Sequence, residues 1–301
     1  MIGIAITFSL GRFHATPWGR HVNEAVPEWP PSPWRILRAL VATWKRKLDH
    51  RIFSDPKVFE RLLRKLAEPP LFVLPPAAIG HTRSFMPWFK KGPNDRTLVF
   101  DSFICVDKTH AVACLWPEDV LKMEERECLE LLSSHLSFLG RADSWVEARM
   151  FTDDEAESAY AQVNCQPMEG TSKDAMFDAV RVLCADPDSA FDNEYMPKHQ
   201  QTRGRGKDKQ TICTAMYDPD WHLCMETLDL HNKRWSYPPG SQWVTYLRRK
   251  DCFMPLSRIQ KNIFERPRPT IARYAIDGAA LPSVEETLSI AELARRTVMG
   301  V

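Results

Sequence analysis

Apolar residues along the chain follow alternating and helical spacings that predict short strands and helices. Residues 2–8 alternate and are rich in β-branched side chains, which predicts a first strand. From 33 to 48 apolar residues recur every three or four positions, after Ser32 as N-cap and Pro33 at the first helical position. This spacing predicts an amphipathic helix with a basic outer face. A second helix is predicted after Asp55-Pro56, with its buried face formed by Val58, Phe59, Leu62, Leu63 and Leu66.

The remaining pattern predicts a mixture of strands and helices separated by irregular segments. Strands are predicted at 97–106, 111–116, 145–151, 211–217 and 242–247, and helices at 117–139 and 221–234. Segments 11–31, 75–96, 153–172 and 196–210 are predicted as loops, and 173–184 fits either a helix or a strand. A strand at 271–276 and a helix at 283–299 close the sequence. This order predicts an α+β fold, with ferredoxin-like β-α-β units and long insertions.

Composition places the chain among globular proteins. It has 301 residues, of which 44% are hydrophobic and 26% charged, and no apolar run approaches the ~18 residues of a membrane helix. The N-terminus is predicted to be a strand, not a signal peptide. Eight cysteines are scattered without a CxxC pair, which predicts reduced thiols and a cytoplasmic location, and argues against structural zinc. No cofactor is predicted.

Charge is distributed unevenly, although the net charge is only +1. Residues 1–100 carry 16 Lys and Arg against 7 Asp and Glu, residues 101–230 carry 12 against 26, and residues 231–301 carry 12 against 6. Two basic blocks around an acidic one predict a protein with one side facing a polyanion. The alternative is that sequence blocks do not form faces in space.

Basic and aromatic residues gather in segments that are candidates for binding RNA. Cations with an aromatic side chain between them can hold phosphates and stack a base. The alternative for the first loop is that it is solvated and that its tryptophan packs in the core. The candidates are Arg12, His14, Trp18, Arg20 and His21 in the first loop, Arg35 and Arg38 on the basic helix, His81 and Arg83 in a second loop, and Arg203, Arg205 and Lys207 in a third. For the second loop, a local turn network is an equally good interpretation.

Catalytic and metal motifs are missing from the sequence. There is no HExxH or GxSxG, and the GRGKDK run at 204–209 lacks P-loop spacing. A ribonuclease that works without metal needs only a His, Lys or Tyr near a phosphate and leaves no spacing signature. His14, His21 and His81 therefore stay open as catalytic candidates. No catalytic residue is assigned.

Several long segments carry a resemblance to one protein family. They are GRFHATPWGRHVNE (11–24), EWPPSPWRILRALVATW (28–44), GHTR with MP (80–87), TLVFDSF (97–103), GRADSWVEAR (140–149) and RWSYPPGSQWV (234–244). Together they resemble the fused guide-capping and guide-processing RAMP subunit of type I-G (formerly I-U) CRISPR-Cas effector complexes (Cascade). The resemblance extends from one end of the chain to the other.

The resemblance implies an RRM-like, ferredoxin-like RAMP domain at 1–265 that grips the 5′ handle of the CRISPR RNA. Such a subunit caps a backbone of guide-coating subunits, contacts the large effector subunit and meets target DNA through the complex, in antiviral defense. Residues 266–301 correspond to a connector and the first β–α unit of a guide-processing endoribonuclease domain, and the family's later histidine-containing stretch does not occur here. We therefore expect truncation in that domain and an RNA-binding subunit that does not itself cleave.

Two alternatives remain at this stage. The chain itself is a metal-independent endoribonuclease that processes repeat RNA, or it is a protein scaffold without RNA contact. The leading hypothesis predicts that the basic first hundred residues, including Arg12, Arg20 and Arg38, form one cradle for a single-stranded RNA tail.

Overall fold

The chain forms two compact units, Met1–Leu256 and Ser257–Val301. A computed structural model describes residues 1–48, 53, 55, 57–87, 96–118, 120–168, 170, 174–194, 200–203, 210–213, 220–253 and 283–299. In the second unit the described residues form one 3-10 turn, η6 (Val284–Glu286), and helix α6 (Thr287–Met299). Leu288 and Leu293 of α6 are 84% and 67% exposed. All features below belong to the first unit.

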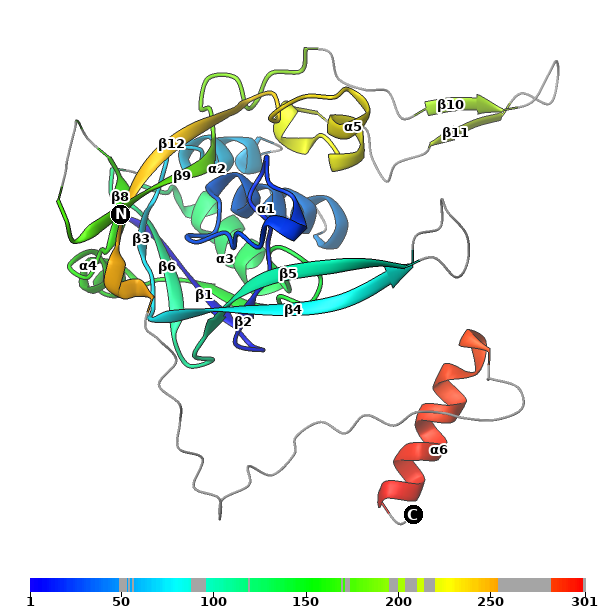
Figure 1. Ribbon diagram of the computed structural model, residues 1–301. Helices are drawn as coiled ribbons and strands as arrows, with labels where there is room; N and C mark the ends of the chain where they lie inside the picture. The colour runs from blue at the N-terminus through cyan, green and yellow to red at the C-terminus, as the bar shows by residue number, and fades with distance from the viewer. Residues whose placement is uncertain are drawn as a thin grey trace, which may run out of the picture. The chain divides into compact units, whose positions relative to one another are not determined.

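A seven-stranded antiparallel sheet forms the centre of the first unit (Figure 1). Its strands, in spatial order, are β7 (Val146–Met150), β1 (Ile2–Phe8), β6 (Ala111–Trp116), β3 (Leu71–Val73), β8 (Cys165–Pro167), β12 (Ser241–Arg249) and β9 (Phe177–Ala185). β9 pairs with β12 over nine residues and lies at one end of this order. The predicted α+β class is therefore confirmed, and the strands of this sheet pair antiparallel.

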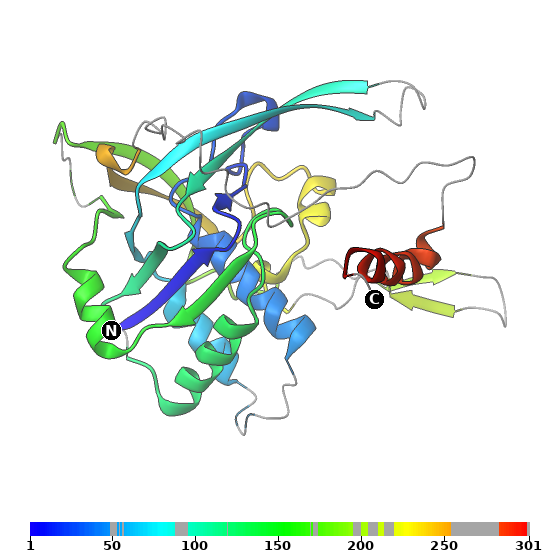
Figure 2. The same ribbon diagram turned by 90° about the horizontal axis from the view of Figure 1, so that it is seen from below.

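A second sheet consists of a long hairpin and a short third strand. Its order is β2 (Arg12–Phe13), β5 (Arg96–Val106) and β4 (Ala77–Pro87). β4 and β5 pair along eleven residues each, and Figure 2 shows the hairpin in cyan, extending away from the helices. A separate two-stranded ribbon is formed by β10 (Gln200–Arg203) and β11 (Gln210–Cys213).

Helices α1 (Pro33–Lys47), α2 (Val58–Leu66) and α3 (Met123–His135) pack together against the sheet. Shorter elements are α4 (Asp153–Tyr160), α5 (Thr227–Asn232), and the 3-10 turns η1 (Val22–Glu24), η4 (His222–Cys224) and η5 (Lys250–Cys252). α1 begins after Ser32, as the sequence predicts, although the Ser32 hydroxyl donates to the carbonyl of Leu183 on β9 and does not cap the helix. This bond ties the start of α1 to the edge of the sheet.

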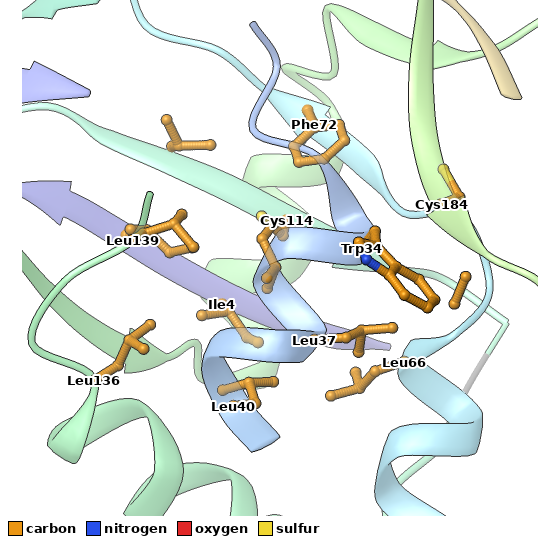
Figure 3. Packing of buried hydrophobic residues seen from close by; sticks show 14 of the residues in the cluster. Ile4, Trp34, Leu37, Leu40, Leu66, Phe72, Cys114, Leu136, Leu139 and Cys184 are labelled. Atoms are coloured by element: carbon orange, nitrogen blue, oxygen red, sulfur yellow. The ribbon is translucent and has the colours of Figure 1, made fainter. Parts of the chain in front are cut away.

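The apolar faces of the helices supply the core. In Figure 3, Trp34, Leu37 and Leu40 of α1 lie among side chains of the sheet, including Ile4 and Cys114. The rings of Trp44 and Phe59 stack at 4.5 Å and join α1 to α2. All five apolar residues predicted for the buried face of α2 are buried. Each such side chain contributes about 1.5–3 kcal/mol on burial, so this packing fixes the position of α1.

Most predicted elements are confirmed, and several segments differ. Residues 75–96 are predicted as a loop, yet 77–87 form β4, because full-length pairing with β5 outweighs the weak strand propensity of its Gly and Ser residues. Residues 153–172 contain α4 and β8. α4 begins with a reciprocal capping box between Thr152 and Glu155, a signal present in the sequence. The helix predicted at 221–234 is reduced to α5, preceded by η4.

In other segments the observed elements have different bounds from the predicted ones. Strand β9 (Phe177–Ala185) covers most of the ambiguous 173–184 segment, and the helix predicted at 117–139 covers only Met123–His135. The basic loop predicted at 196–210 includes β10. The strand predicted at 271–276 lies outside the described residues.

Candidate nucleic-acid interface

A cavity in the first unit lies between the 17–32 loop, the base of β4 and the edge strand β9. Its volume is about 660 Å³, within the range of small-molecule sites. It is lined by Pro17–Arg20, Val26–Pro30, Ser32, Ile79, Val180–Leu183, Trp243, Arg248 and Phe253. Aromatic rings and arginines from distant parts of the sequence therefore share one concave surface, which we call the tryptophan cavity.

Trp18 is held in place on this surface by a hydrogen bond. Its indole Nε1 donates to the backbone carbonyl of Ser236 at 2.7 Å, across 218 positions of sequence. The ring is partly buried against the core. A ring whose orientation is fixed before binding loses little conformational freedom when a base stacks on it, so Trp18 is suited to be a stacking platform.

A buried ion pair shapes the loop that carries Trp18. Arg35 of α1 donates from Nε and Nη2 to the two carboxylate oxygens of Glu28 at 2.8 and 2.9 Å, and from Nη2 to the carbonyl of Thr16 at 3.1 Å. Glu28 also accepts from the backbone N–H of Ser32 at 2.9 Å. Burial lowers the pKa of Arg35, but the charge of Glu28 and its hydrogen bonds outweigh this and raise the pKa. Arg35 therefore connects helix α1 to the loop and holds the loop in position.

Three arginines place positive charge around the tryptophan cavity. The guanidinium of Arg181 lies 4.9 Å from the ring centre of Trp243, and that of Arg248 lies 4.5 Å from the ring centre of Phe253. Arg248 also donates to the carbonyl of Trp29 at 2.6 Å. Arg20 is 57% exposed and pairs with Glu24 at 3.0 Å. Such an exposed pair is weak, so a phosphate competes readily for Arg20.

His81 and Arg83 lie on strand β4, so their predicted placement in a loop is wrong. Alternation puts both on the same face as Ile79 and Phe85, and the register places Phe100 of β5 opposite Arg83. The ring of Phe100 lies 4.9 Å from that of His81 and 5.3 Å from the guanidinium of Arg83. This exposed face of the hairpin begins at Ile79, which lines the tryptophan cavity, and continues along β4 to Phe85.

The other face of the hairpin packs on Arg12 and His14. The Phe103 ring lies over Gly80, where a Cβ atom would come within 2.5 Å of the ring. The Arg12 guanidinium lies 3.9 Å from the centre of the Phe103 ring on β5. Arg12 also pairs with Asp143 at 3.4 Å. Arg12 therefore joins the base of the hairpin to the 140–144 segment.

His14 is 5% exposed and lies between two carboxylates. Its Nδ1 is hydrogen-bonded to Asp143 at 2.9 Å, and its Nε2 lies 3.0 Å from Asp101 Oδ1 without hydrogen-bond geometry. Arg141 pairs with Asp101 on the outer side. Burial raises the pKa of Asp143, but the hydrogen bond from His14 and the charges of His14 and Arg12 hold it below its usual value. Basic and acidic side chains thus alternate from Arg12 to Arg141 and join the hairpin to the 140–144 segment. His14 is too buried in this cluster to reach a phosphodiester.

Helix α1 does not present Arg38 to the tryptophan cavity. Arg38 donates to the backbone carbonyls of Leu223, at 3.0 Å, and of Met225. It lines a second cavity of about 330 Å³ beside η4. Arg12, Arg20 and Arg38 thus occupy three different environments, and the prediction that they form one cradle is wrong, because α1 is amphipathic in a layered fold and its basic face meets other chain segments.

The remaining candidates are His21, Arg203, Arg205 and Lys207. His21 precedes η1 and is exposed. Arg203 is on β10, opposite Gln210, while Arg205 and Lys207 lie outside the described residues. Their roles in RNA binding stay predictions.

Sequence reasoning missed the arginines and aromatics on β9 and β12. Arg181 and Trp243 are 62 positions apart, and only the pairing of Leu183 with Trp243 brings them together. The signal present in the sequence is the short apolar run at 182–185, which fits a buried strand but does not identify its partner.

Comparisons with known proteins leave the family undetermined: no protein-family model and no curated protein sequence matches this chain. Within the described ranges, no helix is long and apolar enough to cross a membrane. The described side chains also include no group of three or more His, Cys, Asp or Glu arranged to hold a metal ion.

Proposed function

We propose that this chain binds the single-stranded 5′ handle of a CRISPR RNA as a subunit of a type I-G effector complex. The observation that carries the proposal is the tryptophan cavity, whose lining includes the hydrogen-bonded Trp18 together with Arg20 and Arg181. Stacking surfaces next to cations bind splayed bases and the phosphates between them. The family resemblance, through its segments around 11–24 and 234–244, covers both Trp18 and Trp243 and supplies the identity of the RNA.

The same proposal includes the architecture and the partners. The antiparallel sheet and the helices packed on it agree with a RAMP-type, ferredoxin-like domain with long insertions. In this role the subunit caps the backbone of guide-coating subunits, contacts the large subunit and meets target DNA through the complex. Cleavage of repeat RNA belongs to the guide-processing domain that follows in the family, and no residue described here is assigned to it.

The first experiment measures the affinity of the chain for single-stranded RNA. The purified chain is titrated against labelled single-stranded RNA of about ten nucleotides and against a duplex of equal length, with fluorescence anisotropy as the readout. Trp18→Ala is expected to weaken single-strand binding about five- to 150-fold, the effect of one lost stacking contact. Arg20→Ala is expected to reduce the slope of log K against log salt by about 0.7, the contribution of one phosphate contact.

Two matched variants serve as controls. Trp145→Ala removes a tryptophan that is 57% exposed and lies outside the cavity, and Arg126→Ala removes an arginine paired with Asp153 on the outside of α3. Neither is expected to change affinity. The proposal fails if all four variants bind single-stranded RNA as the parent chain does, or if the parent chain shows no preference for single strands.

A further inference from the structure

Strand β9 forms one edge of the seven-stranded sheet and also one wall of the tryptophan cavity. Along an antiparallel strand, the backbone N–H and C=O groups of successive residues point to opposite sides. At an edge, every second residue therefore directs a donor and an acceptor away from the sheet.

Hydrogen bonds on both sides of β9 identify Arg181. Thr245 of β12, which lies opposite Arg181, accepts a hydrogen bond from the N–H of Met168 at 2.8 Å, so its backbone groups point away from β9. Leu183, two positions along β9, accepts from the hydroxyl of Ser32 on the outer side at 2.5 Å. Both observations require the N–H and C=O of Arg181 to face outward, and no partner for either group is found among the described residues.

Arg181 therefore combines three groups at one position. Its outward N–H donates, its outward C=O accepts, and its guanidinium lies on the ring of Trp243. The residue lines the same cavity as the fixed ring of Trp18. Each of the four nucleobases carries a donor and an acceptor side by side on its pairing edge, which is the pattern that the main chain of an edge strand complements.

We propose that the tryptophan cavity holds a single unstacked nucleobase, with its face on Trp18 and its pairing edge on the main chain of Arg181. This inference rests on the proposed function for the ligand class, and adds the site and the mode of recognition. A cavity of about 660 Å³ accommodates a base with its sugar but not a base-paired duplex. Only one nucleotide of the bound RNA enters it.

The test is a coupling experiment between protein and RNA. Single-stranded RNAs of one sequence, each with one abasic nucleotide at a successive position, are titrated against the parent chain and against Trp18→Ala. If one base occupies the cavity, Trp18→Ala weakens binding about five- to 150-fold for intact RNA and has almost no effect when that one nucleotide is abasic. At all other positions the full effect of Trp18→Ala persists.

The main-chain contact is tested at Arg181. Arg181→Pro removes the outward N–H, and edge strands tolerate proline where the N–H faces away from the neighbouring strand. Compared with Arg181→Ala, which also lacks the guanidinium, Arg181→Pro is expected to weaken binding of intact RNA by about a further five- to tenfold, and this additional loss should be confined to the same nucleotide. Arg181→Ala keeps both main-chain groups, so its loss is independent of the abasic position. Substituting each of the four bases at the coupled position then identifies the preferred one.

The outcomes separate this inference from the function on which it rests. If the chain binds single-stranded RNA but Trp18→Ala weakens every abasic RNA equally, the base pocket is refuted while RNA binding stands. If no single-stranded RNA binds, both fail. If Arg181→Pro does not fold, the Trp18 coupling alone decides whether a base occupies the cavity.

Discussion

Replacing Glu28 by glutamine tests whether the buried ion pair holds the cavity loop in place. The Glu28 side chain is 7% exposed and accepts from Arg35 and from the N–H of Ser32. Glutamine retains one acceptor oxygen but turns an amide donor toward the guanidinium of Arg35. Since Arg35 is itself 31% exposed, water solvates part of the unpaired charge.

The magnitude follows from these contacts. Breaking a fully buried pair costs about 3–5 kcal/mol, and a hydrogen bond to a charged group contributes about 1.5–3 kcal/mol. With one acceptor retained and Arg35 partly hydrated, we expect Glu28→Gln to lower the free energy of unfolding by about 2 kcal/mol. At a typical urea dependence this shifts the unfolding midpoint by roughly 1 M.

The assay is urea unfolding followed by tryptophan fluorescence. Glu24→Gln is the matched control, because Glu24 is in the same loop and also pairs with an arginine, Arg20, but at the surface. Its midpoint is expected to match that of the parent chain. Equal midpoints for Glu28→Gln and Glu24→Gln would refute the structural role assigned to the buried pair.

Three further predictions concern the rest of the first unit. Gly80→Ala should lower thermal stability, because the added methyl group meets the Phe103 ring, and the loss should largely disappear in the double variant with Phe103→Ala. Asp143 has a pKa below its usual value, so its contribution to stability is complete above the unfolded value of about 3.9 and is lost as pH falls through the folded pKa; melting temperatures of Asp143→Asn should depend less on pH in that window. Burial raises the pKa of Cys184 to about 12, so iodoacetamide at pH 8 should modify this thiol only after unfolding, as measured by mass spectrometry.

Local patterns were sufficient for the elements with strong periodicity. The β-branched alternation of 2–8 and the apolar spacing of α1 and α2 each reflect burial of one face, which sequence spacing records directly. Strand β4 was missed because its stability comes from pairing with β5, a contact that its own composition does not encode.

The candidate site was predictable only in part, for a related reason. Trp18 and Arg20 stood out because a short loop concentrates them. Arg35 stood out for its charge alone, and charge does not distinguish an arginine that meets RNA from one that meets a buried glutamate such as Glu28. Arg181 required the strand order, because its recognition groups belong to the main chain.

The position of β12 also has a consequence for the order of events during synthesis. Among the strands that the structure describes, β12 is the one that joins β9 to the sheet, and the Trp18 ring is hydrogen-bonded to Ser236, just before β12. A nascent chain that ends before residue 236 therefore has neither the wall nor the anchored ring of the cavity. We expect guide RNA to be captured after translation has passed this strand, so that ribosome-bound fragments do not sequester transcripts.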